Sequence, residues 1–104
     1  DATTLAFMAY GRHGSISVTS NIAPKLCSQF MQLCLSKDFA EAAKINDKLM
    51  PLHHALFVES SPGPVKYAAS KLGLCGEEIR LPLTLISDET KVLVDKALKH
   101  ASLI

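Results

Sequence analysis

Lysine side chains are the first candidates for chemistry in this sequence, because a desolvated lysine can be neutral near pH 7 and attack a carbonyl carbon. Lys66 is the most suggestive, since it follows the tight turn in PGPVKY, but the helical pattern around it favours a surface or interface position. The lysines on helical patterns are Lys25, Lys44, Lys48, Lys66, Lys71, Lys91, Lys96 and Lys99. None of them follows the single strand-like stretch of the chain, so no catalytic residue is predicted within it.

Two adjacent histidines suggest metal binding or acid–base work, but their spacing argues against a shared metal. His53 and His54 lie within a helical pattern, where neighbouring side chains point about 100° apart. The pattern therefore predicts one packed and one solvated histidine. His13 stands between Gly11 and Gly14 and is expected in a turn. No metal site is predicted.

The cysteines are expected to be reduced and to pack as small hydrophobic residues. Cys27 and Cys34 lie seven positions apart in a helical pattern, which separates their Cα atoms by about 10 Å. A disulfide bond needs less than about 7 Å. With Cys75 the number of cysteines is odd, so at least one must stay unpaired. This use of cysteine is typical of a cytoplasmic protein.

Composition excludes several classes of protein. The 104 residues are 48% hydrophobic and 20% charged, and the net charge is +1. This is an ordinary globular composition without a basic stripe, so a nucleic-acid partner is not expected. No apolar run approaches the roughly 20 residues of a membrane helix, and a membrane partner is not expected either. The sequence does not start with Met, and we expect it to begin inside a longer protein.

The elements that must position these residues are mostly helices. Asn21 is expected to cap the helix that opens with Pro24, and Asp38 with Glu41 resembles a capping box. Glycines and prolines mark the other boundaries, and Ser87 is expected to cap the last helix. The predicted helices cover residues 3–10, 24–34, 38–56, 65–72 and 88–101.

Residues 15–20 differ from the rest of the chain because small polar and β-branched residues alternate there. This period of two predicts a strand. A lone strand leaves its amide and carbonyl groups unpaired, which costs free energy when they are buried. We therefore expect Ile16 and Val18 to belong to a sheet whose other strands are not part of this chain.

Several consecutive stretches resemble the dihydrodipicolinate synthase family of pyruvate-dependent aldolases. The stretches are GSISVTSNIAP, DFAEAAKINDKLMPLHHALFVE, PVKYAASKLGL, EEIRLPLTLISDETK and ALKHASLI, in that order. The resemblance implies an α/β fold, namely the C-terminal portion of a (β/α)8 TIM barrel with an appended helical domain, mostly α in this chain. Residues 1–37 would hold helix 7, strand 8 and helix 8 of the barrel, and residues 38–104 would form the C-terminal helical domain.

The resemblance also implies a reaction, in which pyruvate condenses with aspartate semialdehyde through a lysine Schiff base on the route to lysine and diaminopimelate. No cofactor is expected. The catalytic lysine of the family lies upstream of Asp1, so the chain alone is expected to be inactive. Its expected partners are the remainder of the barrel and further copies of the same protein, as a dimer or tetramer.

A few residues receive roles from this resemblance. Ile16 would lie at the pyruvate pocket and contribute its backbone carbonyl, with a plain core position in the barrel as the alternative. Ala6, Ala9 and Tyr10 would lie on a helix at an oligomer interface. Asp1 is expected to cap the first helix, with a position at the pocket mouth as the alternative.

Two other interpretations stay open at this point. The chain could be a stand-alone helical interaction module that has lost catalysis, or part of another pyruvate aldolase such as N-acetylneuraminate lyase. The strand-like stretch distinguishes a stand-alone module from part of a barrel, because a module must pair Ile16 and Val18 within itself or with a second copy.

Overall fold

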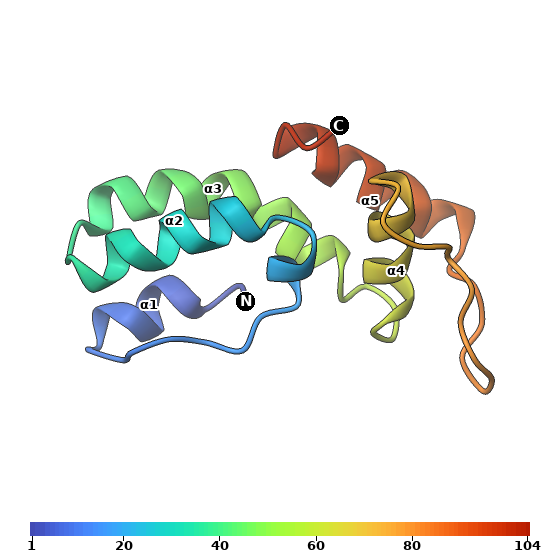
Figure 1. Ribbon diagram of the computed structural model, residues 1–104, viewed down its shortest axis with the longest axis horizontal. Helices are drawn as coiled ribbons and strands as arrows, with labels where there is room; N and C mark the ends of the chain where they lie inside the picture. Colours follow the sequence, from blue (N-terminus) through green and yellow to red (C-terminus); the bar gives the residue numbers. More distant parts are fainter.

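The computed structural model describes residues 1–104, and the chain is almost entirely helical (Figure 1). Figure 1 shows α1, α2 and α3 side by side in one half of the molecule, with α4 and α5 in the other. The elements are α1 (Thr4–Ala9), the 3-10 turn η1 (Thr19–Asn21), α2 (Pro24–Leu35), α3 (Phe39–Ala55), α4 (Gly63–Lys71) and α5 (Asp88–His100). The prediction of a mostly helical chain is confirmed.

Side-chain caps set the start of the two longest helices, as their sequences predict. The carboxylate of Asp38 accepts a hydrogen bond from the Glu41 amide at the start of α3. The hydroxyl of Ser87 accepts one from the Thr90 amide at the start of α5. Each bond satisfies an amide that has no partner within the helix.

The predicted cap of α2 is wrong. Asn21 belongs to η1, where its side-chain amide donates to the carbonyl of Val18, and Ala23 is the residue that precedes the helix. Pro24 nevertheless occupies the first turn, where its missing N–H costs nothing. The chain reaches α2 through a 3-10 turn, and the amide of Ala23 donates to the carbonyl of Thr19 instead.

The strand predicted for residues 15–20 is not formed, which corrects the sequence prediction. Residues 12–17 have no regular secondary structure, and Val18 leads directly into η1. No backbone hydrogen bond joins Ser15 or Ile16 to another segment. The physical reason is that a strand is defined by its neighbours, and no other part of this chain is extended beside these residues.

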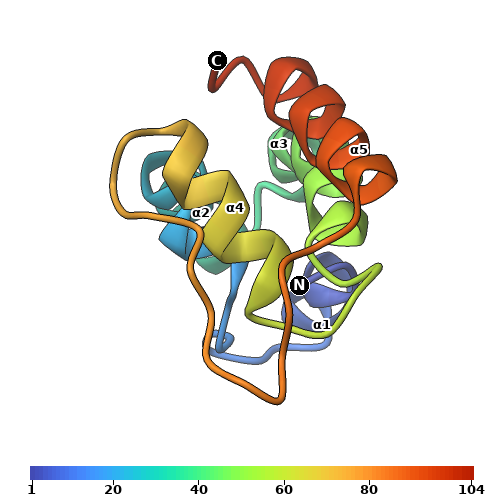
Figure 2. The same cartoon turned by 90° about the vertical axis from the view of Figure 1, so that its right-hand side faces the viewer.

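Helix α3 joins two apolar cores. Its first half packs with α1 and α2 around Met8, Phe30, Cys34 and Ala42. Its second half packs with α4 and α5 in a larger core that includes the fully buried Leu52, Leu56, Val94 and Leu98. Figure 2 shows α4 and α5 inclined to each other at the end of the molecule reached by this second core. The boundary predicted at residues 37 and 38 falls in the turn before α3, and the division into two domains remains a prediction.

A long connection between α4 and α5 projects from the helices (Figures 1 and 2). It contains the exposed Leu74, Leu81 and Leu85, with a turn at residues 81–82. None of the helices has both the length and the apolar character required to cross a lipid bilayer.

Candidate functional site

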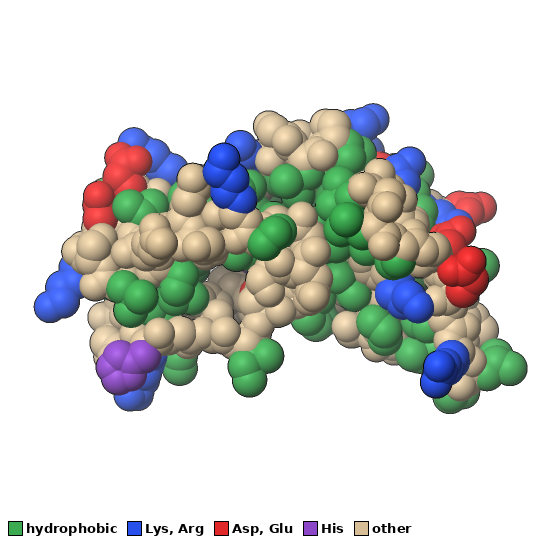
Figure 3. All heavy atoms as spheres, in the orientation of Figure 1, with side chains coloured by type: hydrophobic (Ala, Val, Ile, Leu, Met, Phe, Trp, Pro, Cys, Tyr) green, Lys and Arg blue, Asp and Glu red, His purple; other side chains and the backbone are tan.

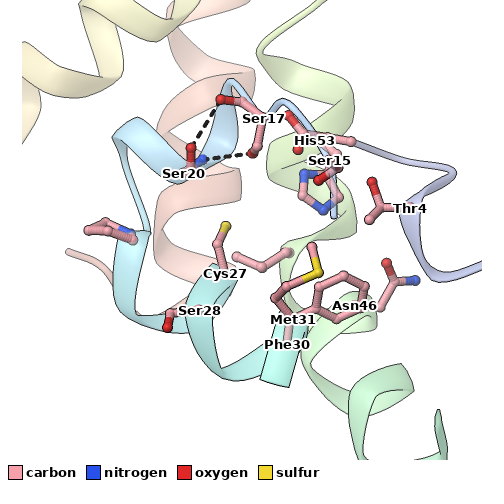
Figure 4. Close-up of a pocket in the computed structure, with 13 residues that line it drawn as sticks. Thr4, Ser15, Ser17, Ser20, Cys27, Ser28, Phe30, Met31, Asn46 and His53 are labelled. Carbon is pink, nitrogen blue, oxygen red and sulfur yellow. Dashed lines mark hydrogen bonds between the residues drawn. The ribbon is translucent and has the colours of Figure 1, made fainter. Parts of the chain in front are cut away.

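A cavity of about 280 Å³ lies where the irregular residues 14–17 pass over α2 and α3 (Figure 4). The space-filling view shows a hollow between α2 and this segment (Figure 3). Hydroxyl side chains from three segments line the cavity, and Phe30, Met31 and Leu49 form its apolar part. The hydroxyl groups belong to Thr4, Ser15, Ser17, Ser20 and Ser28.

The alternation in residues 15–17 survives without a strand. Ser15 and Ser17 line the cavity, as Figure 4 shows, whereas Ile16 is absent from its lining and is fully exposed. A large apolar side chain left entirely in solvent gains nothing from folding. The face of residues 14–17 that carries Ile16 is therefore exposed to solvent.

Asp1 has a different role from the one its position before α1 predicts. No side chain caps α1, so the capping prediction is wrong. Instead, Asp1 Oδ2 accepts hydrogen bonds from the amide of Val18 at 2.9 Å and from the amide of Thr19 at 3.1 Å. Bonds from two amides to one carboxylate oxygen are charge-assisted and hold the start of η1 against the start of the chain.

Thr19 and His53 connect this turn to α3. Thr19 is completely buried, and its Oγ1 lies 2.7 Å from Nδ1 of His53, which is 7% exposed. Burial of His53 is the main cause that lowers its pKa from 6.5 to about 4, and the positive charges of the N-terminal amine and of His54 add to it. His53 is therefore neutral near pH 7, and His54 is exposed. The prediction of one packed and one solvated histidine is confirmed.

Two further polar groups face the cavity. Burial raises the pKa of the Cys27 thiol, partly offset by a hydrogen bond with Ser17, so the thiol is protonated near pH 7 and is a poor nucleophile. Oδ1 of Asn46 is buried and has no hydrogen-bond partner. Sequence reasoning missed Asn46, although its spacing of three and seven residues from Leu49 and His53 places all three on one face of α3.

Lysines are absent from the lining of the cavity. No lysine of the chain is buried, and Lys66, the most suggestive one, donates a hydrogen bond to the carbonyl of Glu78 in the connection before α5. The environment that makes a lysine nucleophilic, a desolvated pocket, is therefore not provided to any lysine here.

The predicted interface residues share one feature, which is exposure on or next to α1. Ala6 and Ala9 are exposed, and Tyr10 is 84% exposed immediately after the helix. A tyrosine this exposed contributes little to the stability of the chain itself. The roles of Ala6, Ala9, Tyr10 and Ile16 remain predictions.

Comparison with known sequences gives one family. The model described as "Dihydrodipicolinate synthetase family" matches residues 1–101. Over 104 residues the chain is 54% identical to the 4-hydroxy-tetrahydrodipicolinate synthase of Bartonella henselae and 57% identical to that of Roseobacter denitrificans. These matches cover 100% of this chain but 35% and 36% of the two relatives.

Solved structures agree with the sequence comparison. A monomeric dihydrodipicolinate synthase variant matches with a TM-score of 0.96 and 38% identity, covering 100% of this chain and 35% of that one. The chloride-inhibited dihydrodipicolinate synthase of Acinetobacter baumannii, complexed with pyruvate, matches with a TM-score of 0.94 and 42% identity. That match covers 99% of this chain and 35% of the other. The fold of this chain is therefore that of a mostly helical part of these larger proteins.

Proposed function

Because the chain belongs to the dihydrodipicolinate synthetase family, we propose that it is the C-terminal part of a 4-hydroxy-tetrahydrodipicolinate synthase. The whole enzyme is a lyase that condenses pyruvate with aspartate semialdehyde through a lysine Schiff base, in the biosynthesis of lysine and diaminopimelate. The names of the relatives at 54% and 57% identity support this proposal. The pyruvate complex of the A. baumannii protein supports pyruvate as the substrate.

The exposed face of residues 14–17 is the observation that carries the proposal. Ile16 is fully exposed although it lies in a β-branched, strand-like sequence, and its backbone makes no bond to another segment. Neighbouring strands from the remainder of a barrel would pair this backbone and cover Ile16. In that position, the carbonyl of Ile16 would be a fixed acceptor at the pyruvate pocket.

The chain by itself is then inactive, because the nucleophile lies in the remainder of the barrel. Support comes from the lysines, none of which is buried or lines the cavity. A neutral, desolvated lysine is required for Schiff-base formation near pH 7.

Borohydride trapping tests whether the nucleophilic lysine lies outside this chain. Incubation of the full-length protein with pyruvate and borohydride is expected to give a stable adduct, detected by mass spectrometry, whereas this chain under the same conditions gives none. A parallel incubation without pyruvate controls for nonspecific reduction. An adduct on the isolated chain would show that one of its own lysines is the nucleophile. No adduct on the full-length protein would contradict the proposed reaction.

The enzyme is further proposed to be a cytoplasmic homotetramer, in which Ala6, Ala9 and Tyr10 contact a neighbouring dimer. The supporting observation is the exposure of Tyr10, at 84%, beside two small residues that allow close approach. Aromatic residues of this kind are common anchors of protein interfaces.

A further inference from the structure

Three segments that are distant in sequence meet at the end of residues 14–17. Asp1 accepts hydrogen bonds from the amides of Val18 and Thr19, 17 and 18 positions away. The hydroxyl of Thr19 bonds to His53, 34 positions further along the chain. Thr19 is 0% exposed, so its hydroxyl has no water as an alternative partner, and His53 is 7% exposed.

These contacts fix the point where the segment with Ile16 ends. Ile16 is two residues before Val18, a span of about 7 Å in an extended chain. Residues 12–17 form no backbone–backbone hydrogen bonds, and the carbonyl of Ser17 accepts one from the Ser20 hydroxyl. The position of Ile16 therefore depends on how its C-terminal neighbours are held. His53 joins Thr19 to α3, and the second half of this helix is anchored in the larger apolar core.

We propose that Asp1, Thr19 and His53 are positioning residues that hold the Ile16 carbonyl in place for pyruvate, so that the end of α3 controls the geometry of the pocket. This inference rests on the proposed function, since it assigns the contacts a purpose in that reaction. It gives the helical domain a part in catalysis without placing any of its side chains on the substrate. An error of about 1 Å in such a group can cost on the order of 100-fold in rate.

A direct acid–base role for His53 is less consistent with the structure. Burial lowers the pKa of this imidazole and keeps it neutral near pH 7, whereas an efficient proton-transfer group has a pKa near the working pH. A neutral imidazole can donate to the Thr19 hydroxyl or accept from it, depending on the tautomer, so the contact persists in either form.

The two substrates allow positioning to be separated from general destabilisation. A Schiff-base mechanism proceeds in two halves, and kcat/KM for each substrate reports on its own half. A displaced Ile16 carbonyl affects the pyruvate half. We therefore expect Thr19→Val and His53→Leu in the full-length protein to lower kcat/KM for pyruvate roughly 10- to 100-fold. The value for aspartate semialdehyde should change less than about threefold.

Two variants provide the matched controls. His53→Asn places an amide at the position of the imidazole Nδ1, keeps the bond to Thr19, and is expected to restore the pyruvate value to within about threefold of wild type. His54→Asn changes the exposed neighbour and is expected to leave both values unchanged. Should His53→Leu fail to fold, Thr19→Val carries the test, because it replaces only a hydroxyl by a methyl group.

The outcomes separate this inference from the proposed function. A wild-type protein that forms no pyruvate adduct overturns the proposed function and this inference with it. If the wild type is active and Thr19→Val leaves kcat/KM for pyruvate unchanged, only the positioning role is overturned. Equal losses for both substrates, with no rescue by His53→Asn, would also overturn it, because they indicate a merely structural contact. A selective loss that His53→Asn restores supports it.

Discussion

Insertion of one glycine between Ile16 and Ser17 is expected to lower the synthase activity of the full-length protein by at least about 100-fold. The bonds from Asp1 hold Val18 and Thr19, so the extra residue must displace the segment on its N-terminal side. A shift of one residue exchanges the two faces of an alternating sequence. Ser15 would then turn away from the cavity, and the register with the neighbouring strands would be lost.

The control for this insertion changes the side chain and leaves the backbone as it is. Ile16→Val is expected to change kcat/KM for pyruvate by less than about threefold, since the proposed role belongs to the carbonyl group. Circular dichroism and the thermal midpoint should show that both proteins are folded before their rates are compared. An insertion that is tolerated, or an Ile16→Val variant that is inactive, would contradict a backbone role for this residue.

Leu52→Ala is expected to lower the free energy of unfolding of the chain by roughly 2–5 kcal/mol. Leu52 is 0% exposed and belongs to the larger core, where α3 meets α4 and α5. Its truncation removes buried apolar surface and leaves a cavity that helices anchored at both ends cannot close completely. Equilibrium unfolding in urea, followed by circular dichroism at 222 nm, measures this loss.

An exposed leucine on α5 provides the comparison. Leu93 is 47% exposed on α5, and Leu93→Ala is expected to cost less than about 1 kcal/mol. The two variants lose the same atoms, so the difference between them reports burial alone. Equal losses would mean that the packing of α3 against α5 is not what stabilises the helical domain.

Local sequence signals were sufficient to predict the helices. The apolar spacing of α3 and α5, with Asp38 and Ser87 as caps, gave their starts to within a residue, because each signal acts within one or two turns. Gly11 and Gly73 follow helices with positive φ angles of 86° and 75°, where a side chain would be strained. These features need no information from distant parts of the chain.

The strand prediction failed for the opposite reason. Residues 15–17 keep two faces, with Ser15 and Ser17 lining the cavity and Ile16 outside it, but a strand also needs a neighbour to pair with. Within residues 1–104 no such neighbour exists. Residues 15–17 thus have a sequence that favours a strand, but this chain by itself offers no strand to pair with them.

The polar contacts around Thr19 could not be predicted from neighbouring residues in the sequence, because they join distant segments. Asp1 precedes α1, and its carboxylate is bound by amides that reach it only after the chain has turned back at Gly11. That one of His53 and His54 is buried and the other exposed could be predicted from their angular separation. The identity of the partner, Thr19, could not be predicted, since it depends on the tertiary fold.

Hydrogen exchange at residues 15–17 tests most directly whether their hydrogen-bonding neighbours belong to another part of the protein. Amide exchange would be followed in this chain alone and after it is combined with the complementary N-terminal part of the synthase. In the chain alone these amides should exchange close to the rate of an unstructured peptide, and in the active complex at least about 100-fold more slowly. Amides that are already protected in the isolated chain, or that stay unprotected in an active complex, would contradict an incomplete barrel.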